Sequence, residues 1–201
     1  MYGASLHMHS FDFIYLWTIF VVRLLKNTAI LFSVFAVSSA FAQVHAAGTE
    51  SLIKAVMLRK FVEFVEWPEA NAPRKLLRAN VCVYGDSDIM DTAVVFSKTS
   101  EKSTLKYGME HIDTLNFPAS KCQIVFIGNV SESAMGDAIE KLKTRSVLTI
   151  SDSSEFVEKG GMVGFVVVDG RLRYNINNSA FNEAGLKVDA QLLEIANKVV
   201  N

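Results

Sequence analysis

The pattern of hydrophobic and polar positions carries most information between Ser146 and Ala196. Residues 147–150 and 162–168 are short, continuous apolar runs, which are typical of strands buried on both faces. Residues 171–177 alternate polar and apolar side chains, which predicts a strand with one solvated face. Between the last two runs, Asp169-Gly170 predicts a tight type I′ hairpin turn, because that turn needs positive φ at both central residues.

The remaining pattern predicts helices that alternate with strands. Apolar residues recur at helical spacing over residues 50–65, and Trp67-Pro68 ends this helix because proline disfavours helical backbone in the residue before it. We expect further strands at 79–84, 104–114 and 123–127, and further helices at 88–96, 131–143 and 187–200. The sequence therefore predicts an α/β fold. Its sheet is mostly parallel and flanked by helices on both faces, with an antiparallel edge hairpin near the C-terminal end.

The N-terminal segment has the pattern of an export signal. Of the 201 residues, 50% are hydrophobic, and much of that excess lies in the first 42. Arg23 and Lys26 precede a charge-free run over residues 28–42, about as long as a signal-peptide core and short for a membrane span. Small residues at its end predict cleavage between Ala42 and Gln43, while an uncleaved membrane anchor is the alternative. We thus expect a signal peptide over residues 1–42 and a single periplasmic domain over 43–201, with no membrane insertion after cleavage.

A second apolar run, over residues 11–22, precedes this signal and has no part in a conventional one. Two interpretations remain open. Either the leader is unusually long, or residues 1–20 reflect a start codon placed too far upstream, with translation beginning at Val21 or Val22.

Charge and motif content exclude several classes of function. Asp12, Arg23 and Lys26 are the charged residues of the first 42, so the body has a formal charge near −2 and no basic stripe of the kind that nucleic-acid-binding proteins carry. No P-loop, dinucleotide fingerprint, nucleophile elbow or zincin motif is present. His45 and His111 are the only histidines of the body, too few for a metal cluster or a histidine-dependent triad. We therefore expect no catalytic residues, no metal site and no cofactor.

The chain has two cysteines, Cys82 and Cys122, and each lies in or beside a predicted strand. An even count in an exported protein suggests a disulfide, which requires Cα atoms about 4.4–6.8 Å apart. Two buried free thiols are the alternative, because cysteine is also a common core residue.

Polar groups follow three of the predicted strands and open the segments after them. Asp86, Ser87, Ser151 and Asp152 are candidate ligand or partner contacts, because ligands of open α/β sheets bind at the carboxyl ends of strands. Simple helix capping by serine and aspartate is the alternative.

Two arginines add a second group of candidates. Arg171 and Arg173 fall on one face of the predicted hairpin strand, where they are suited to an acidic partner or ligand, or alternatively lie on a solvated face.

Taken together, these residues resemble the YfiR family of exported bacterial proteins. The resemblance extends over about residues 50–198 and rests on the order and spacing of several short motifs. These are KFVEFVEWP at 60–68, CVYGD at 82–86, CQIVFI at 122–127, VLTISD at 147–152, GGM at 160–162, NIN at 175–177 and AGLK at 184–187.

The resemblance implies a periplasmic α/β domain without known catalysis. It further implies that the protein binds the periplasmic part of an inner-membrane diguanylate cyclase and restrains it, so modulating cyclic-di-GMP signalling and biofilm formation. It also implies that Cys82 pairs with Cys122, whereas a second disulfide found in some members has no cysteines here. A periplasmic small-molecule-binding protein is the alternative function, and a homodimer is left open.

Overall fold

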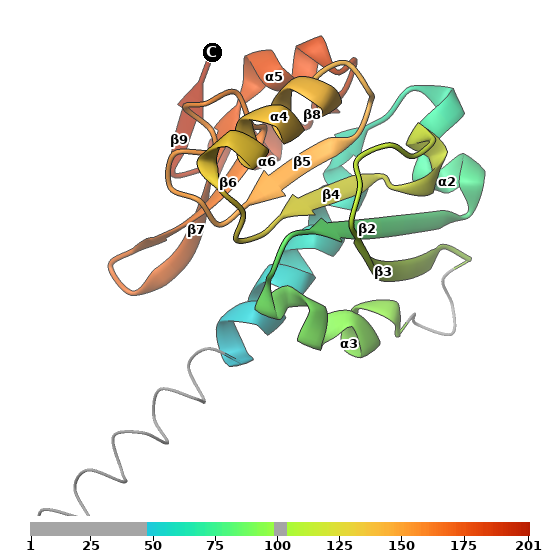
Figure 1. The fold of residues 1–201 in the computed structure, drawn as a ribbon, viewed down its shortest axis with the longest axis horizontal. Coiled ribbons are helices and arrows are strands. Elements are labelled where there is room, and N and C mark those ends of the chain that lie inside the picture. Colours follow the sequence, from blue (N-terminus) through green and yellow to red (C-terminus); the bar gives the residue numbers. More distant parts are fainter. Residues whose placement is uncertain (1–47, 99–103) are drawn as a thin grey trace, which may run out of the picture. The chain divides into compact units, whose positions relative to one another are not determined.

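The hydrophobic runs form the middle of a seven-stranded sheet whose order is β3-β2-β4-β5-β6-β7-β9 (Figure 1). The computed structural model describes residues 48–98 and 104–201, of which 49–201 form one compact unit. The sheet strands are β2 (Arg78–Tyr84), β3 (Lys106–Ile112), β4 (Ile124–Ile127), β5 (Leu148–Ser151), β6 (Val163–Val168), β7 (Arg171–Asn177) and β9 (Lys198–Val200). A separate antiparallel pair joins β1 (Val65–Glu66) to β8 (Lys187–Val188).

Helices and short 3-10 turns connect the strands. Residues 48–64 are helical and are called the N-terminal helix below. The others are η1 (Glu69–Asn71), α2 (Pro73–Leu76), η2 (Asp88–Thr92), α3 (Ala93–Ser97), η3 (Ala119–Lys121), α4 (Glu132–Leu142), α5 (Asn178–Glu183) and α6 (Ala190–Glu194). Within the described residues, no helix combines the length and apolar character that a membrane crossing demands.

The predicted fold class is confirmed. β3, β2, β4, β5 and β6 run parallel to their neighbours, and β6 pairs with β7 in antiparallel register from Val163↔Ile176 to Val168↔Arg171. Asp169 and Gly170 have φ values of 50° and 70°, as a type I′ turn requires. β9 then pairs in parallel with the outer side of β7 and becomes the last strand.

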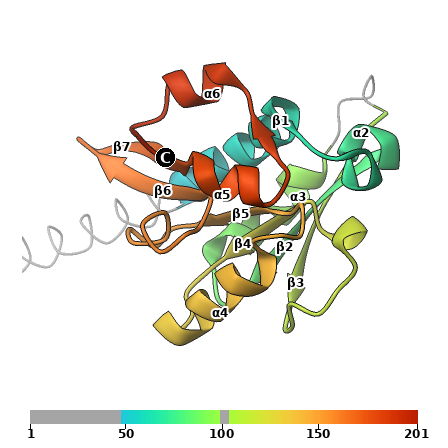
Figure 2. The same cartoon turned by 90° about the horizontal axis from the view of Figure 1, so that it is seen from above.

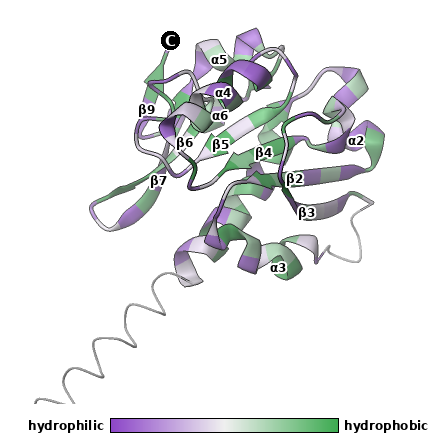
Figure 3. Ribbon diagram, viewed as in Figure 1, coloured by the Kyte–Doolittle hydropathy of each residue, from purple (hydrophilic) through white to green (hydrophobic). Residues whose placement is uncertain are grey.

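Alternating side chains of the central strands divide the core in two. One cluster contains Val81 and Val83 and packs under the N-terminal helix, α5 and α6. The other contains Cys82 and Val125 and packs under α4. Figure 2 shows α4 on one side of the sheet and α5 and α6 on the other. Hydropathy colouring shows the inner strands as the hydrophobic centre of the unit (Figure 3).

The predicted helix at 187–200 is wrong. Only residues 190–194 are helical, and the segments on either side are β8 and β9. Both ends of the predicted helix lie beside open strand edges, β1 and β7, and their valines pair there instead. Cross-strand pairing thus overrides the local helical pattern.

The N-terminal helix confirms the predicted element, but only part of its predicted apolar face is buried. Leu52, Ile53 and Val56, which contributed to its apolar spacing, are 44%, 44% and 58% exposed. Instead the buried face includes two polar residues, Ser51 and Lys54, which find polar partners at the edge of the sheet. The rest of the buried face is apolar and includes Leu58, Phe61 and Val62, so the two polar residues bring the N-terminal part of the helix into the candidate site.

Candidate functional site

A hollow of about 500 Å³ lies at the carboxyl ends of β2, β4 and β5. After β2 the chain turns through η2 and α3 to β3, whereas after β4 it turns through α4 to β5 on the other side. This reversal is the topological switch point at which open α/β sheets bind ligands. The lining residues are Asp86, Ser87, Asp88, Gly128, Asn129, Val130, Glu132, Met135, Asp152, Ser153, Glu155 and Lys159.

Backbone contacts close the crevice directly between β2 and β4. The N–H of Gly128 donates to the Tyr84 carbonyl at 2.9 Å, and the N–H of Asn129 donates to the Asp86 carbonyl at 2.7 Å. A Cβ at Gly128 would lie 2.3 Å from that Asp86 oxygen, so the close approach requires glycine. These bonds join the loop that follows β2 to the loop that follows β4. The hollow is therefore open between these two loops and the segment that follows β5.

Three of the four predicted strand-end contacts meet in this hollow. Asp86, Ser87 and Asp152 line it, but Ser151 does not. Ser151 is 1% exposed, and its hydroxyl donates to the Ile127 carbonyl at 2.7 Å. It therefore joins β5 to β4 instead of facing a ligand.

The predicted capping roles are correct at two of the three strand ends. Ser87 accepts from the N–H of Ile89 at the start of η2, and Ser131 accepts from that of Ala134 at the start of α4. Helix capping, the alternative for Ser151 and Asp152, does not occur at the third strand end, because residues 154–160 form successive turns and not a helix. The Ser151 hydroxyl, buried against β4, also accepts from the N–H of Ser153 and so ends the strand in a tight turn.

A buried lysine organises the charges at one side of the hollow. Lys54 is 5% exposed, and its Nζ lies 2.7 Å from a Glu50 oxygen and 3.1 Å from an Asp152 oxygen. Beside this group, the Ser51 hydroxyl donates to Asp88 at 2.5 Å. The N-terminal helix is thereby tied to the ends of β2 and β5 by polar contacts.

The two partners of this ion pair respond differently to their surroundings. Burial alone lowers the pKa of Lys54, but the hydrogen bond to Glu50 and the charge of Asp152 outweigh it, and the net pKa is raised. Burial raises the pKa of Asp152, and Lys54 offsets this only in part because Asp88 and Glu50 repel the carboxylate. The site thus holds Lys54 charged and makes the ionised form of Asp152 costly.

Sequence reasoning missed Lys54, because a lysine in an amphipathic helix is normally expected at a solvent-exposed position.

On the other side of the hollow, Lys159 pairs with Glu132 at 2.6 Å and with Glu155 at 2.7 Å. The five carboxylates of the lining outnumber the cations, so the hollow is acidic.

The two predicted arginines lie elsewhere. Arg171 and Arg173 are exposed on β7, two residues apart and on one face, as predicted, but neither lines the hollow. Within the described ranges, the structure gives neither arginine an ion pair or side-chain hydrogen bond.

Nucleophile–base chemistry has little support at this site. His111, the single histidine in the described residues, lies on β3 with its Nε2 3.3 Å from Asp113, outside the lining of the hollow. Among residues 48–98 and 104–201, no three acidic, histidine or cysteine side chains gather as metal ligands would. Among the residues that the structure describes, the lining of the hollow is thus charged and contains no histidine.

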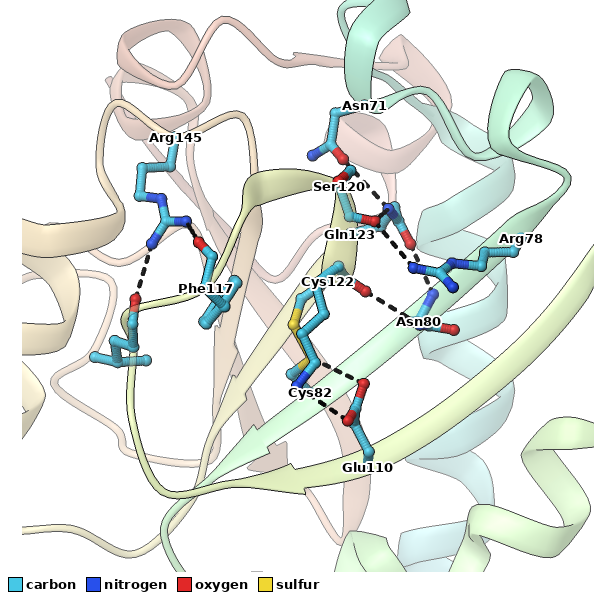
Figure 4. The surroundings of a disulfide bond; sticks show 12 residues. Asn71, Arg78, Asn80, Cys82, Glu110, Phe117, Ser120, Cys122, Gln123 and Arg145 are labelled. Carbon is cyan, nitrogen blue, oxygen red and sulfur yellow. Dashed lines mark hydrogen bonds and ion pairs between the residues drawn. A yellow bond between two sulfur atoms is a disulfide. The ribbon is translucent and has the colours of Figure 1, made fainter.

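A disulfide joins Cys82 on β2 to Cys122, just before β4, with Cα atoms 5.7 Å apart. The pairing implied by the resemblance is thus present in the structure. Both cysteines are fully buried in the core under α4. Figure 4 shows Glu110 beside the bond, and its carboxylate lies 3.2 Å from Lys121. The cross-link fixes the start of β4 against the middle of β2.

The predicted cleavage site, Ala42 and Gln43, lies outside the described residues.

Comparisons with known proteins give one family match and several similar solved structures. The family DUF4154, described as YfiR/HmsC-like, matches residues 51–197. No curated protein matches the chain. Among solved structures, an ABC domain in complex with L-Trp from Streptococcus pneumonia is similar at 14% identity and a TM-score of 0.45, covering 61% of this chain and 56% of that one. A conserved domain protein from Vibrio cholerae is similar at 12% identity and a TM-score of 0.43, covering 60% and 54%. The chain thus spans little more than half the length of these structures.

Proposed function

Because the chain belongs to the YfiR/HmsC-like family, whose members regulate membrane diguanylate cyclases, we propose that it binds and restrains such a cyclase from the periplasm. In this function the protein is exported by its N-terminal signal, is cleaved between Ala42 and Gln43, and contacts the periplasmic part of an inner-membrane signalling protein. Its release raises cyclic-di-GMP and favours biofilm formation.

The observation that carries the proposal is the extent of the family match. Residues 51–197 include nearly all of the compact unit, so the resemblance concerns the whole fold and not one motif. Two features of the chain support it. The buried disulfide suits an oxidising compartment. The acidic hollow offers a charged surface to a partner, which fits a binding role.

Deletion of the gene tests this function in cells. We expect cyclic-di-GMP, measured by mass spectrometry of extracts, to rise and to return to its starting value when the full chain is supplied. A matched control supplies residues 43–201 behind an initiator methionine, which keeps the protein in the cytosol and should not complement. Unchanged cyclic-di-GMP after deletion would contradict the proposed function.

Crosslinking identifies the partner directly. The full chain, expressed in its native host and crosslinked in intact cells, should be recovered with a membrane diguanylate cyclase. The mass of the same purified protein should correspond to a chain that begins at Gln43. An intact leader would contradict the predicted cleavage but not the regulatory role.

A small-molecule-binding function is the second candidate, favoured by the 500 Å³ hollow that collects Asp86, Ser87 and Asp152. Its test is thermal unfolding with a panel of cationic and zwitterionic metabolites, because a ligand that binds the folded state alone raises Tm. If no member of the panel raises Tm, this candidate fails.

A further inference from the structure

The outer edge of β7 is open over its first half. β9 pairs with β7 at Asn175–Asn177, and just before it the N–H of Asn197 donates to the Tyr174 carbonyl at 2.9 Å. Nearer the turn, at residues 171–173, no strand of the described ranges lies on this side of β7. Figure 1 shows the hairpin of β6 and β7 extending away from the other strands there. Such an edge carries backbone groups with which an added strand can pair.

Hydrogen bonds farther along β7 show which way its backbone groups point. The Tyr174 carbonyl faces the outer side, because it accepts from Asn197. The N–H of Asn177 faces the opposite side, because it donates to the Met162 carbonyl just before β6. Backbone groups of successive residues in a strand alternate between the two sides. The N–H and carbonyl of Leu172 therefore point outward, into the open edge, and those of residues 171 and 173 point toward β6.

One face of the hairpin is anchored in the core. The rings of Phe165 and Tyr174 lie 6.3 Å and 5.3 Å from that of Phe61, so this face packs on the N-terminal helix. Leu172 is two residues from Tyr174, so its side chain lies on the same face, where it is half-buried. The packed base holds the open edge in one orientation relative to the sheet.

The other face of the hairpin carries two exposed arginines, Arg171 and Arg173, on either side of Leu172. Within the part of the chain that the structure describes, neither makes an ion pair or a side-chain hydrogen bond. By contrast, three other arginines donate to backbone carbonyls of the body, namely Arg59, Arg78 and Arg145. Alternate residues of a strand are about 6.6–6.8 Å apart, so the two guanidinium groups match the spacing of alternate side chains on a strand placed beside them. The edge thus presents a basic, an apolar and a basic position in turn.

We propose that an extended acidic segment of the regulated membrane protein adds to this edge as a further strand, an inference that rests on the proposed function. The backbone of the segment pairs with the N–H and carbonyl of Leu172, as in other cases of strand addition. Its acidic side chains, at alternate positions, have Cβ atoms about 4.5–5.5 Å from those of Arg171 and Arg173, and the apolar residue between them contacts Leu172. The recognised pattern is therefore acidic, apolar, acidic in an extended segment.

Charge and backbone pairing together favour this occupant over two others. The same edge of a second copy would place arginine opposite arginine, and like charges directly across a strand pair are destabilising. Anionic lipid headgroups would satisfy the arginines but offer no strand to the backbone groups of Leu172, and they repel the carboxylate of Asp169 at the turn. A strand that carries carboxylates meets both requirements.

Variants of the full chain, supplied to the gene-deletion strain, test the two parts of this contact. R171E/R173E should no longer restore low cyclic-di-GMP, because it turns attraction of the acidic segment into repulsion. L172P should fail as well, because proline removes the outward N–H of Leu172, which the ladder to β6 does not use.

Matched controls separate these effects from general damage. L172A keeps the backbone N–H, and R74E reverses an exposed arginine on α2, away from the hairpin (Figure 1); both should restore the wild-type level. Thermal unfolding of the purified mature proteins should give R171E/R173E and L172P the same Tm as their controls.

Crosslinking from the hairpin identifies the segment itself. A photoreactive benzoylphenylalanine in place of Val168, directly opposite Arg171 in the pairing of β6 with β7, should form a covalent adduct with a membrane diguanylate cyclase in intact cells. The adduct should map by mass spectrometry to an acidic periplasmic segment, and its yield should fall at least about tenfold with R171E/R173E. The same group in place of Val94, an exposed residue of α3, is the control and should give no such adduct.

The outcomes distinguish this proposal from the proposed function. If deletion raises cyclic-di-GMP but R171E/R173E still restores the low level, the edge is not the docking surface, although the regulatory function stands. An adduct from position 168 that maps only to copies of this chain, or to a segment without acidic residues, would also overturn the proposal. If L172P unfolds at a lower Tm than L172A, the arginine variant and the crosslink decide. Unchanged cyclic-di-GMP on deletion would remove the proposed function first, and this proposal with it.

Discussion

Removing the disulfide should cost this fold a large share of its stability. The bond closes a loop with a sequence separation of 40, and its Cα–Cα distance of 5.7 Å is within the ordinary range, so the cross-link needs no distortion of the backbone. For a loop of that length the chain-entropy model gives about 13 cal/mol/K, which is about 4 kcal/mol at 25 °C. A domain of ordinary stability has about 5–15 kcal/mol in total.

The test compares three forms of the mature protein by urea denaturation at equilibrium. Relative to the oxidised wild type, the wild type in excess reductant should lose about 4 kcal/mol, which lowers the urea midpoint by roughly 2 M. Cys82→Ala/Cys122→Ala should lose somewhat more, because it also removes two buried sulfurs from the core under α4. Tm should fall by about 8–16 °C.

The order of the three forms in free energy of unfolding separates the contribution of the cross-link from the contribution of sulfur packing in the core. Reductant should leave the double alanine variant unchanged, which makes that variant its own control. A loss below about 1 kcal/mol in reduced wild type would refute the reasoning, since loop closure would then contribute little to stability. An effect of reductant on the variant would show that the cause is not the disulfide.

Further predictions concern the charges and glycines at the hollow. Lys54→Met should destabilise the fold at pH 7 by about 1–2 kcal/mol in chemical denaturation, because it removes the cation from Glu50 and Asp152, whose side chains are 41% and 37% exposed and so are partly screened by water; a loss below about 0.5 kcal/mol would contradict the pairing. Asp152→Asn should change stability by less than about 1 kcal/mol at pH 7, since burial and the neighbouring carboxylates offset most of its attraction to Lys54; a loss as large as that of Lys54→Met would be evidence against this view. Because the folded-state pKa of Asp152 is raised, its stabilising contribution is complete below the pKa of the unfolded carboxyl and is lost as pH rises through the folded value. Asp152→Asn should therefore gain stability relative to wild type as pH rises above about 4, and parallel pH profiles would count against the assignment. Gly128→Ala should destabilise by about 1–3 kcal/mol, because its Cβ would lie 2.3 Å from the Asp86 carbonyl oxygen; unchanged urea midpoints would disprove the close approach.

The local sequence pattern predicts the structure most reliably where a single physical requirement determines the element. The turn at Asp169-Gly170 follows from the need for positive φ, and the inner strands follow from continuous apolar runs that only a doubly covered sheet buries. Ser131 at the start of α4 was likewise predictable, because capping acts within one turn. At the start of α5 the side chain of Asn177 likewise accepts from the N–H of Ala180.

The candidate site was predictable only in its location. That polar loops gather at the carboxyl ends of strands follows from the alternation of strands and helices, and this correctly grouped Asp86, Ser87 and Asp152. The part played by Lys54 was not predictable, since its ion pair joins residues almost a hundred positions apart. Likewise, Ser151 is a polar residue at a strand end, as a ligand contact would be, but its hydroxyl donates to a carbonyl of the neighbouring strand.

The sequence by itself determined the class of fold, the hairpin and the family, because these depend on periodicity, turn chemistry and the order of motifs along the chain. Tertiary structure alone decided which helix face is buried, that the last strand replaces a helix, and that Lys54 meets Asp152 beside the acidic hollow. These features arise from contacts between distant segments, such as β9 with β7 and Lys54 with Asp152, where pairing and burial outweigh local propensity.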